Sequence, residues 1–246
     1  MPAEESQVFH CMQPFSGIEE GFLILRTVIF ANGKMSDPAQ ARAQVKKGDL
    51  LIAADGGALH CLELNLVPDL VIGDFDSLQQ EDLEILESRG AEIIRYPARK
   101  DYTDLELALQ HAVQRGAENI LVIAALGARW DQTLANLLLP AASLLQDTRV
   151  SLIDGPQEIH LVRGPERLEL AGKQGDTVSL IPLGSSADKV TTQGLEYPLN
   201  GETLDFGSTR GISNVMLGES ASIELQQGLL LCVIIHGDKE VLAENR

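Results

Sequence analysis

Two aspartates that follow a short apolar run have the spacing of a metal-binding pair. The run Leu70-Val71-Ile72 ends at Gly73, and Asp74 and Asp76 come directly after it. If the run is a buried parallel strand, both carboxylates lie just beyond its carboxyl end, where open α/β sheets bind ligands. Alternate residues of an extended segment can point the same way, and oxygen ligands suit Mg²⁺. The sequence therefore predicts a magnesium site that includes Asp74 and Asp76.

Further aspartates follow other predicted strands or begin the helices after them. They are Asp55, Asp101, Asp104, Asp131 and Asp154. The strand ends of one parallel sheet share an edge, and carboxylates gathered there repel one another unless cations lie among them. A divalent-metal site for phosphoryl transfer explains the set most simply. The alternative for each single residue is a helix N-cap, a position that favours Asp for local reasons.

Basic residues on the same predicted edge could bind phosphate. Arg99, Lys100 and Arg129 fall there. Arg binds phosphate through two parallel hydrogen bonds, whereas Lys binds it as a point charge. The alternative is that these residues only neutralise the acids. The sequence contains neither GxxxxGK[ST] nor GxGxxG, which excludes the P-loop and the dinucleotide fingerprint.

Strands that alternate with helices must position these residues over the first part of the chain. Apolar strand candidates lie within 22–31 and at 50–54, 70–72, 91–95, 119–126 and 149–153. Helix signals separate them: Asp37-Pro38, capping-box spacings that start at Ser77 and at Thr103, and a segment from Asp131 to about Leu145. This alternation predicts a parallel sheet with helices on both faces.

The pattern of apolar and polar residues changes after Asp154-Gly155-Pro156. Short alternating runs at 167–170, 177–182, 189–192, 222–225 and 229–235 are divided by Gly, Pro and Asn, and no helix signal remains. We expect an antiparallel β-sandwich or barrel here. The predicted fold is an N-terminal parallel-sheet α/β domain, residues 1–154, followed by a C-terminal all-β domain, residues 155–246.

Composition and charge limit the partners of this chain. Its 246 residues carry a formal net charge of −17, which argues against nucleic acid or an anionic membrane as partner. No apolar run approaches the ~20 residues that cross a bilayer, and Glu4 and Glu5 stand where a signal peptide needs positive charge. Cys11, Cys61 and Cys232 have no metal-ligand spacing. We expect a soluble cytoplasmic protein with reduced thiols.

An ordered set of stretches across residues 28–235 resembles the thiamine pyrophosphokinase (thiamine diphosphokinase) family. The stretches are Asp55-Gly56-Gly57, Pro68-Asp69 with Gly73-Asp74-Phe75-Asp76-Ser77, Lys100-Asp101-Tyr102-Thr103-Asp104, Gly127-Ala128-Arg129-Trp130-Asp131-Gln132 with Asn136, and Gly211-Ile212-Ser213-Asn214. The resemblance implies an α/β nucleotide domain followed by a β-domain. It also implies transfer of an intact diphosphoryl group from ATP to the hydroxyl of thiamine, with Mg²⁺, to give thiamine diphosphate and AMP.

The resemblance also implies roles for single residues. It places Asp74, Asp76 and Asp101 around Mg²⁺, and Asp104 near the thiamine hydroxyl as hydrogen-bond acceptor and candidate base. The residues that it implies for ATP are Asn32, Gly33, Asp55, Gly56, Lys100, Thr103, Arg129 and Asp131. Those for thiamine are Gln132, where some members carry His, and Ser213 and Asn214. The last two would act across a homodimer interface; without the resemblance they read as a turn.

Three other functions remain open on the residues alone. Asp74-x-Asp76 echoes the aspartate-nucleophile phosphatases, but these carry Thr or Val where Leu78 stands. A non-catalytic ATP-binding regulatory module would not require so many acids. A pyrophosphokinase acting on another small alcohol, such as a pterin, would use the same chemistry and differ only in its acceptor pocket.

Overall fold

The computed structural model describes residues 25–127 and 129–237. The helices of the first part are α1 (Pro38–Gln44), α2 (Gly57–Glu63), α3 (Gln80–Ser88), α4 (Asp104–Gln114), α5 (Trp130–Leu138), and the 3-10 turns η1 (Leu139–Ala141) and η2 (Ser143–Leu145). The strands are β1 (Leu25–Phe30), β2 (Leu50–Ala54), β3 (Leu70–Gly73), β4 (Glu92–Arg95), β5 (Ala117–Ile123), β6 (Arg149–Asp154), β7 (Gln157–Arg163), β8 (Glu166–Ala171), β9 (Thr177–Pro182), β10 (Ala187–Gln193), β11 (Asn200–Leu204), β12 (Asn214–Val215), β13 (Ser220–Leu225) and β14 (Leu229–Ile235).

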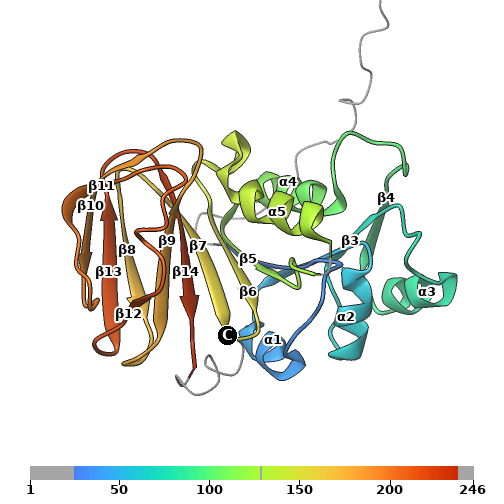
Figure 1. The fold of residues 1–246 in the computed structure, drawn as a ribbon. Helices are drawn as coiled ribbons and strands as arrows, with labels where there is room; N and C mark the ends of the chain where they lie inside the picture. Colours follow the sequence, from blue (N-terminus) through green and yellow to red (C-terminus); the bar gives the residue numbers. More distant parts are fainter. Residues whose placement is uncertain (1–24, 128, 238–246) are drawn as a thin grey trace, which may run out of the picture.

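These strands form two sheets, and the small one packs over the antiparallel part of the large one, at the left of Figure 1. The large sheet has ten strands in the order β12-β9-β14-β7-β6-β5-β1-β2-β3-β4. Its stretch from β6 to β4 is parallel, and the strands from β7 to β12 pair antiparallel. The small sheet, β11-β10-β13-β8, is antiparallel. The expected fold class, a parallel α/β part followed by antiparallel β-structure, is confirmed.

The change from parallel to antiparallel pairing occurs at one tight turn between β6 and β7. Asp154 pairs with Gln157 across it, and the large sheet runs on through this point without a break. The predicted boundary between residues 154 and 155 falls in the same turn. Because backbone pairing continues across it, the division into two domains stays a prediction.

Helices cover both faces of the parallel strands, as the alternation predicted. On one face, Ile72 of β3 belongs to the same buried cluster as Leu109 of α4. On the other, Phe30 of β1 clusters with Cys61 of α2 and Leu86 of α3. Side chains alternate between faces along a strand, so each strand contributes to both clusters. A third cluster fills the space between the large and small sheets.

Two expected helix boundaries are wrong. The helix predicted from Asp131 to about Leu145 ends at Leu138 and gives way to two 3-10 turns, because Pro140 has no N–H to continue it. The helix expected to start with Ser77 as cap starts at Gln80, with a capping box between Gln79 and Asp82. Ser77 instead directs its hydroxyl to Asp76 and accepts a hydrogen bond from Asn32.

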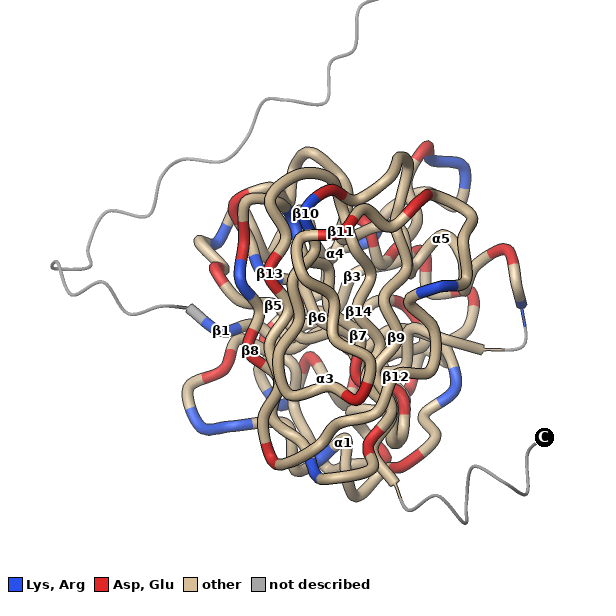
Figure 2. The backbone as a smooth tube through the Cα atoms, turned by 60° about the vertical axis from the view of Figure 1, so that its left-hand side comes forward, with Lys and Arg blue, Asp and Glu red and all other residues tan. Residues whose placement is uncertain are grey.

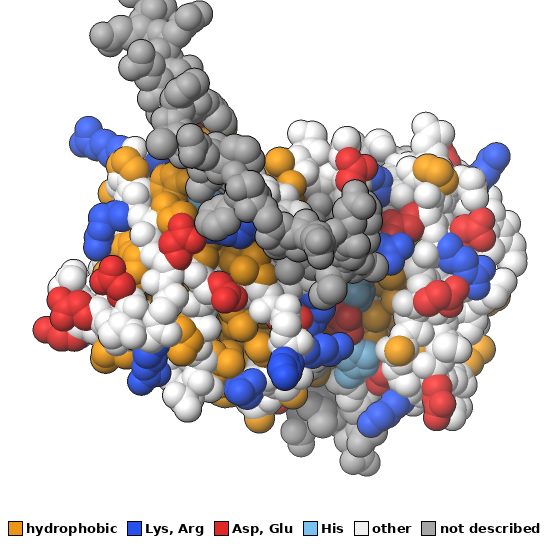
Figure 3. Space-filling model, turned by 180° about the vertical axis from the view of Figure 1, so that it is seen from behind, with side chains coloured by type: hydrophobic (Ala, Val, Ile, Leu, Met, Phe, Trp, Pro, Cys, Tyr) orange, Lys and Arg blue, Asp and Glu red, His pale blue; other side chains and the backbone are white. Residues whose placement is uncertain are grey.

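Acidic residues are spread along the whole chain (Figure 2), and acidic and basic side chains are interspersed on the face in Figure 3. Among the described residues, no helix is long and apolar enough to cross a membrane. The expected cytoplasmic location stays a prediction. Cys61 and Cys232 are buried free thiols, and burial raises the pKa of each to about 12. Cys11 lies outside the described residues.

The carboxyl ends of β1 and β2 approach so closely that glycine is required between them. A Cβ on Gly57 would overlap the carbonyl oxygen of Phe30, and one on Gly56 would overlap the side chain of Asn32. This contact brings the loops after the two strands together at the edge where the predicted site residues lie.

Gly57→Ala should therefore lower the free energy of unfolding by about 1–3 kcal/mol, because backbone atoms must shift to admit the methyl group. Gly218→Ala is the matched control, since a Cβ at Gly218 would meet no atom within 4 Å. Urea denaturation of both variants measures the difference. Equal stability of the two proteins would show that the strand ends can separate at little cost.

Candidate active site

Three aspartates meet at the carboxyl edge of the parallel strands. Asp55 follows β2, and Asp74 and Asp76 follow β3, its parallel neighbour. One carboxylate oxygen of each lies within 4.8 Å of those of the other two. The chain adds β2, β3 and β4 on one side of β1 and then β5 on the other, so the strand order reverses between β1 and β5, with β1 standing between that point and β2. Open α/β sheets bind ligands at such a point.

Asp55 is the buried member of this group, with 6% of its surface exposed. Its Oδ2 accepts a hydrogen bond of 2.9 Å from Asn32 Nδ2, whereas its Oδ1 is buried without a hydrogen-bond partner in the described part of the chain. A buried carboxylate oxygen left unpaired is costly. A cation among the three carboxylates would satisfy it, and a donor set made only of oxygens fits Mg²⁺.

The turn that carries Asp74 and Asp76 is anchored by the residue between them. Phe75 has a φ of 63°, and its side chain is 5% exposed and packs in the core below. The left-handed conformation costs a non-glycine residue roughly 1–2 kcal/mol, so tertiary contacts must hold it. The amide of Asp76 donates to Asp74 Oδ1 at 3.3 Å and closes the turn.

Lys100 brings a fourth acid to the edge. Its Nζ lies 3.1 Å from Asp104 Oδ1 and 3.6 Å from Asp74 Oδ2. Burial raises the pKa of Asp104, against the lowering effect of Lys100, and the charges of Asp55 and Asp74 raise it further. Burial lowers the pKa of Lys100, but the hydrogen bonds and charges of Asp104 and Asp74 outweigh this and raise it overall. The ammonium group therefore stays charged between two acids.

The cluster of aspartates shares two residues with the magnesium ligands that the resemblance implied. Asp74 and Asp76 are in the described cluster, but its third member is Asp55, which the resemblance implied for ATP. Asp101 is exposed and is not part of the group. Asp55 is, however, among the strand-end aspartates for which the residue pattern predicts a divalent-metal site. The role of Asp101 stays a prediction.

The start of α5 holds three predicted site residues at the surface: Arg129 is the N-cap, and Asp131 and Gln132 lie in the first turn. Arg129 donates to both oxygens of Asp131, at 2.6 and 3.2 Å, and these hydrogen bonds lower the pKa of Asp131. Both side chains are about two-thirds exposed, at 68% and 67%, and Gln132 is exposed as well. The amide of Gly33 donates to the carbonyl of Ala124 at 2.7 Å, which ties the loop between β5 and α5 to the end of β1.

Asn32 and Thr103 have structural partners. Asn32 bridges three strand ends, since its Nδ2 donates to Asp55 of the β2 end and, at 3.3 Å, to Ser77 beyond β3. Thr103 is the N-cap of α4 and accepts from the amide of Glu106 at 3.2 Å. Both residues hold the acids in place. Their predicted contacts with ATP stay predictions.

The predicted thiamine residues of the β-part lie far from the acids of the same chain. Ser213 precedes β12, the outermost strand, which stands eight positions from β3, or about 38 Å at ~4.8 Å per strand. The side-chain amide of Asn214 pairs with the backbone of Tyr197, accepting from its N–H at 3.0 Å and donating to its carbonyl at 2.7 Å. The two groups therefore stand toward opposite ends of the large sheet.

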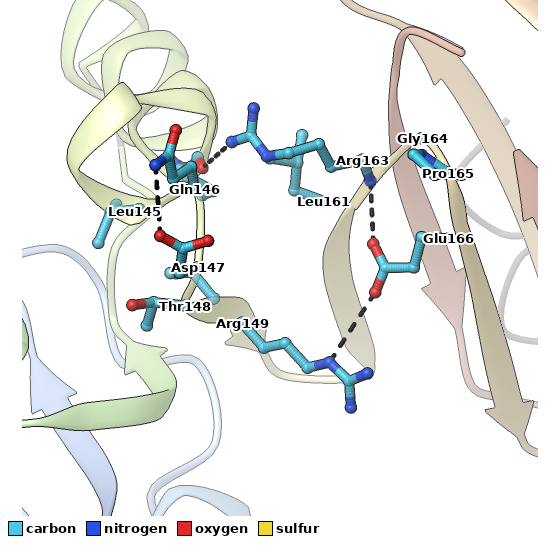
Figure 4. A pocket seen from close by; sticks show the side chains of 12 residues that line it. Leu145, Gln146, Asp147, Thr148, Arg149, Leu161, Arg163, Gly164, Pro165 and Glu166 are labelled. Carbon is cyan, nitrogen blue, oxygen red and sulfur yellow. Dashed lines mark hydrogen bonds and ion pairs between the residues drawn. The ribbon is translucent and has the colours of Figure 1, made fainter. Parts of the chain in front are cut away.

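A cavity of about 340 Å³ lies at the opposite edge of the large sheet (Figure 4). It is lined by the amino end of β6, the carboxyl end of β7 and the η2 turn. Its lining includes two arginines, Arg149 and Arg163, and two acids, Asp147 and Glu166, so their charges cancel. The Nε atom of Arg149 lies 3.9 Å from Oε1 of Glu166. Because the acids stand at the carboxyl ends of β2 and β3, this cavity is separate from the candidate site.

Titration with MgCl₂ should raise the melting temperature of the protein, because a ligand that binds only the folded state stabilises it, by about 2.7 kcal/mol at a hundredfold excess over Kd. Asp55→Asn should abolish most of this shift, since the amide removes the negative charge beside the unpaired oxygen. Asp69→Asn, at a strand start away from the cluster, serves as control. A full magnesium shift in Asp55→Asn would remove this carboxylate from the metal site.

Comparison with known proteins places both parts of the chain in one family. Residues 41–152 match the model for "Thiamin pyrophosphokinase, catalytic domain" and residues 158–230 that for "Thiamin pyrophosphokinase, vitamin B1 binding domain". Thiamine pyrophosphokinase of Bacillus subtilis is 28% identical over 184 residues, which are 75% of this chain and 86% of that protein. Thiamine pyrophosphokinase 1 of Arabidopsis thaliana is 29% identical over 177 residues, 68% of this chain and 66% of that one.

Solved structures agree with this match. The crystal structure of a thiamin pyrophosphokinase family protein from Enterococcus faecalis has a TM-score of 0.72 at 27% identity, covering 87% of this chain and 100% of its own. That of thiamine pyrophosphokinase from Bacillus subtilis shares the fold, with a TM-score of 0.77 at 24% identity, 87% of this chain and 100% of its own. With family models matched over most of its length and its acids gathered at the sheet edge, the chain belongs to the thiamin pyrophosphokinase family.

Proposed function

We propose that this protein is a thiamine diphosphokinase, which transfers the diphosphoryl group of ATP to the hydroxyl of thiamine and forms thiamine diphosphate and AMP. The observation that carries the proposal is the cluster of Asp55, Asp74 and Asp76, with its unpaired buried oxygen, in a chain matched by both models of this family. The cluster would hold a cation beside the negatively charged triphosphate. The family supplies the acceptor.

The carboxylates of Asp55, Asp74 and Asp76 would hold Mg²⁺ through oxygen ligands. When bound there, the ion would supply positive charge to the phosphate oxygens of ATP and orient the chain of phosphates. An oxygen-only site with one buried and two more accessible carboxylates leaves space for substrate oxygens, as Mg²⁺ sites for phosphates require. A net charge of −17 makes such local cations necessary for an anionic substrate.

Lys100 and Arg129 are the basic residues that we assign to the nucleotide. Each is held by an acid of this chain, Lys100 by Asp74 and Asp104 and Arg129 by Asp131. Arg129 is largely exposed, so its fork can turn from a carboxylate to a phosphate of similar shape. Lys100 lies beside Asp74 of the aspartate cluster and would bind the phosphates nearest to the metal ion.

Asp104 is the acid that we assign to the thiamine hydroxyl. It lies at the first turn of α4, and its pKa is raised by burial and by the neighbouring acids, which makes it a better hydrogen-bond acceptor for a hydroxyl proton. Transition states of phosphoryl transfer are loose, so a strong base is not required and the orientation of the hydroxyl matters more. Asp104 would therefore act mainly by alignment.

A homodimer would bring the acceptor residues to the acids. Ser213 and Asn214 lie at the outermost strand of the large sheet, a path of about 38 Å from β3 along the sheet, which favours a crevice completed by another copy. Homodimers most often have twofold symmetry, which would form two equal sites. The acidic surface also favours approach of the positively charged thiazolium ring of thiamine.

The activity can be tested by AMP release from ATP in the presence of Mg²⁺ and a panel of alcohols. Thiamine should support release, and a pterin alcohol should not. Asp104→Asn should lower kcat by about 10²-fold, the cost of misaligning a reacting group, while Asp188→Asn in the β-part should not. ATP binding without AMP formation would favour a regulatory module. AMP release with another alcohol but not with thiamine would show that thiamine is not the acceptor.

The shared site can be tested by mixing two impaired variants. Asp74→Asn should disable the metal side, and Ser213→Lys should repel the thiazolium with a positive charge at an exposed position. If each site draws on both subunits of a twofold dimer, reassembly of an equal mixture restores about a quarter of wild-type activity. No recovery in a mixture shown to exchange subunits would place the whole site within one chain.

A further inference from the structure

Arg95 contacts the Asp74–Phe75–Asp76 turn from the neighbouring strand. It is the last residue of β4 and lies opposite Gly73 in the parallel register of β3 and β4. Its Nη1 donates a hydrogen bond of 2.9 Å to the carbonyl oxygen of Asp74. Its guanidinium carbon lies 4.7 Å from the centroid of the Phe75 ring. One side chain thus contacts two consecutive residues of the turn.

The turn needs such contacts because its backbone is strained. Phe75 has a φ of 63°, and residues in sparsely populated conformations persist only where the surroundings over-determine them. The core anchors the buried ring of Phe75, while Arg95 lies over that ring and also bonds the preceding carbonyl. The contact with Phe75 is electrostatic, since the ring face attracts a cation. Rotation of the peptide between Asp74 and Phe75 would break the hydrogen bond.

Arg95 does not act as an ion-pair partner of the acids. Within residues 25–127 and 129–237, no carboxylate oxygen lies within 4.0 Å of its guanidinium. As a cation it cannot itself bind a metal ion. Its hydrogen bond goes to a backbone carbonyl, so its effect on the carboxylates passes through the shape of the turn. Supports of this kind, one step behind the ligands, commonly set metal affinity.

We infer that Arg95 is a positioning residue, which fixes the spacing of the Asp74 and Asp76 carboxylates and so sets the affinity of the site for a divalent cation. The inference rests on the metal role proposed above for these aspartates. It adds a residue outside the ligand set, on another strand, that the sequence motifs do not include.

The test is calorimetric titration of the full chain with MgCl₂, and with MnCl₂ as a second probe, in the absence of nucleotide. Arg95→Gln should weaken metal binding by about 10- to 100-fold, because the shorter amide cannot both bond the Asp74 carbonyl and cover Phe75. Arg95→Lys keeps the charge and one donor and should recover part of the affinity. Arg89→Gln, an exposed arginine at the end of α3, should bind metal like the wild type.

Melting temperatures measured without metal separate positioning from loss of structure. Arg95→Gln and Arg95→Lys should melt near the wild type, and the loss of metal affinity should persist in folded protein. Phe75→Leu provides an independent route: it removes the ring but keeps an apolar anchor, and Arg95→Gln should cost less affinity in that background than alone.

The outcomes distinguish this inference from the proposed function. The positioning role is overturned if folded Arg95→Gln binds metal with wild-type affinity. It is also overturned if Arg95→Gln and Arg95→Lys lose metal affinity equally and both are unfolded. Either result leaves the enzyme assignment intact. Absence of metal binding by the wild type, or binding unchanged by Asp55→Asn, overturns the metal site on which the inference rests.

Discussion

Repulsion between carboxylates is the constraint on which this structure depends. Parallel pairing places the ends of β2 and β3 side by side, and the aspartates that follow have oxygens within 4.8 Å of one another. At that distance, and at an effective dielectric constant of about 20, two unit charges repel by about 3.5 kcal/mol. Lys100 relieves part of this between Asp74 and Asp104. The unpaired Oδ1 of Asp55 remains, so the edge is suited to a divalent cation.

Holding the acids together strains the backbone, and the rest of the fold offsets that strain. Asp55 and Phe75 both have positive φ angles, 46° and 63°, a region of backbone conformation that most residues other than glycine avoid. The close approach of β1 and β2 at Gly57 and the bridge from Asn32 hold the Asp55 loop. The core below Phe75 and the side chain of Arg95 hold the other loop. Strain at ligand-binding turns, supported by rigid strands, is a common arrangement of functional sites.

The large sheet also explains why the candidate site divides into two groups. Strands β7, β14, β9 and β12 extend the parallel sheet, so the β-part is an outward continuation of the nucleotide part. Ser213 and Asn214 therefore stand toward the other end of a common sheet from the acids. There, the side-chain amide of Asn214 forms hydrogen bonds with the backbone of Tyr197 and orders the edge strand.

Local sequence patterns determined the types of element and the ends of strands. The alternation of apolar runs with helix signals indicated the parallel sheet, and Gly73 marked the end of β3 and the positions of Asp74 and Asp76. Period and turn residues are local properties, readable from a few neighbouring residues. Strands β7, β11 and β12 were missed, because their patterns are weak without their pairing partners.

Only the tertiary structure decided which acids meet. Asp55 joins Asp74 because β2 pairs with β3, and Asp101 does not because the loop after β4 carries it to the surface. The contact of Arg95 with Phe75 likewise follows from the register of β3 and β4. Strand order, register and loop path arise from packing between residues distant in the chain, where the spacing of residue types carries no information.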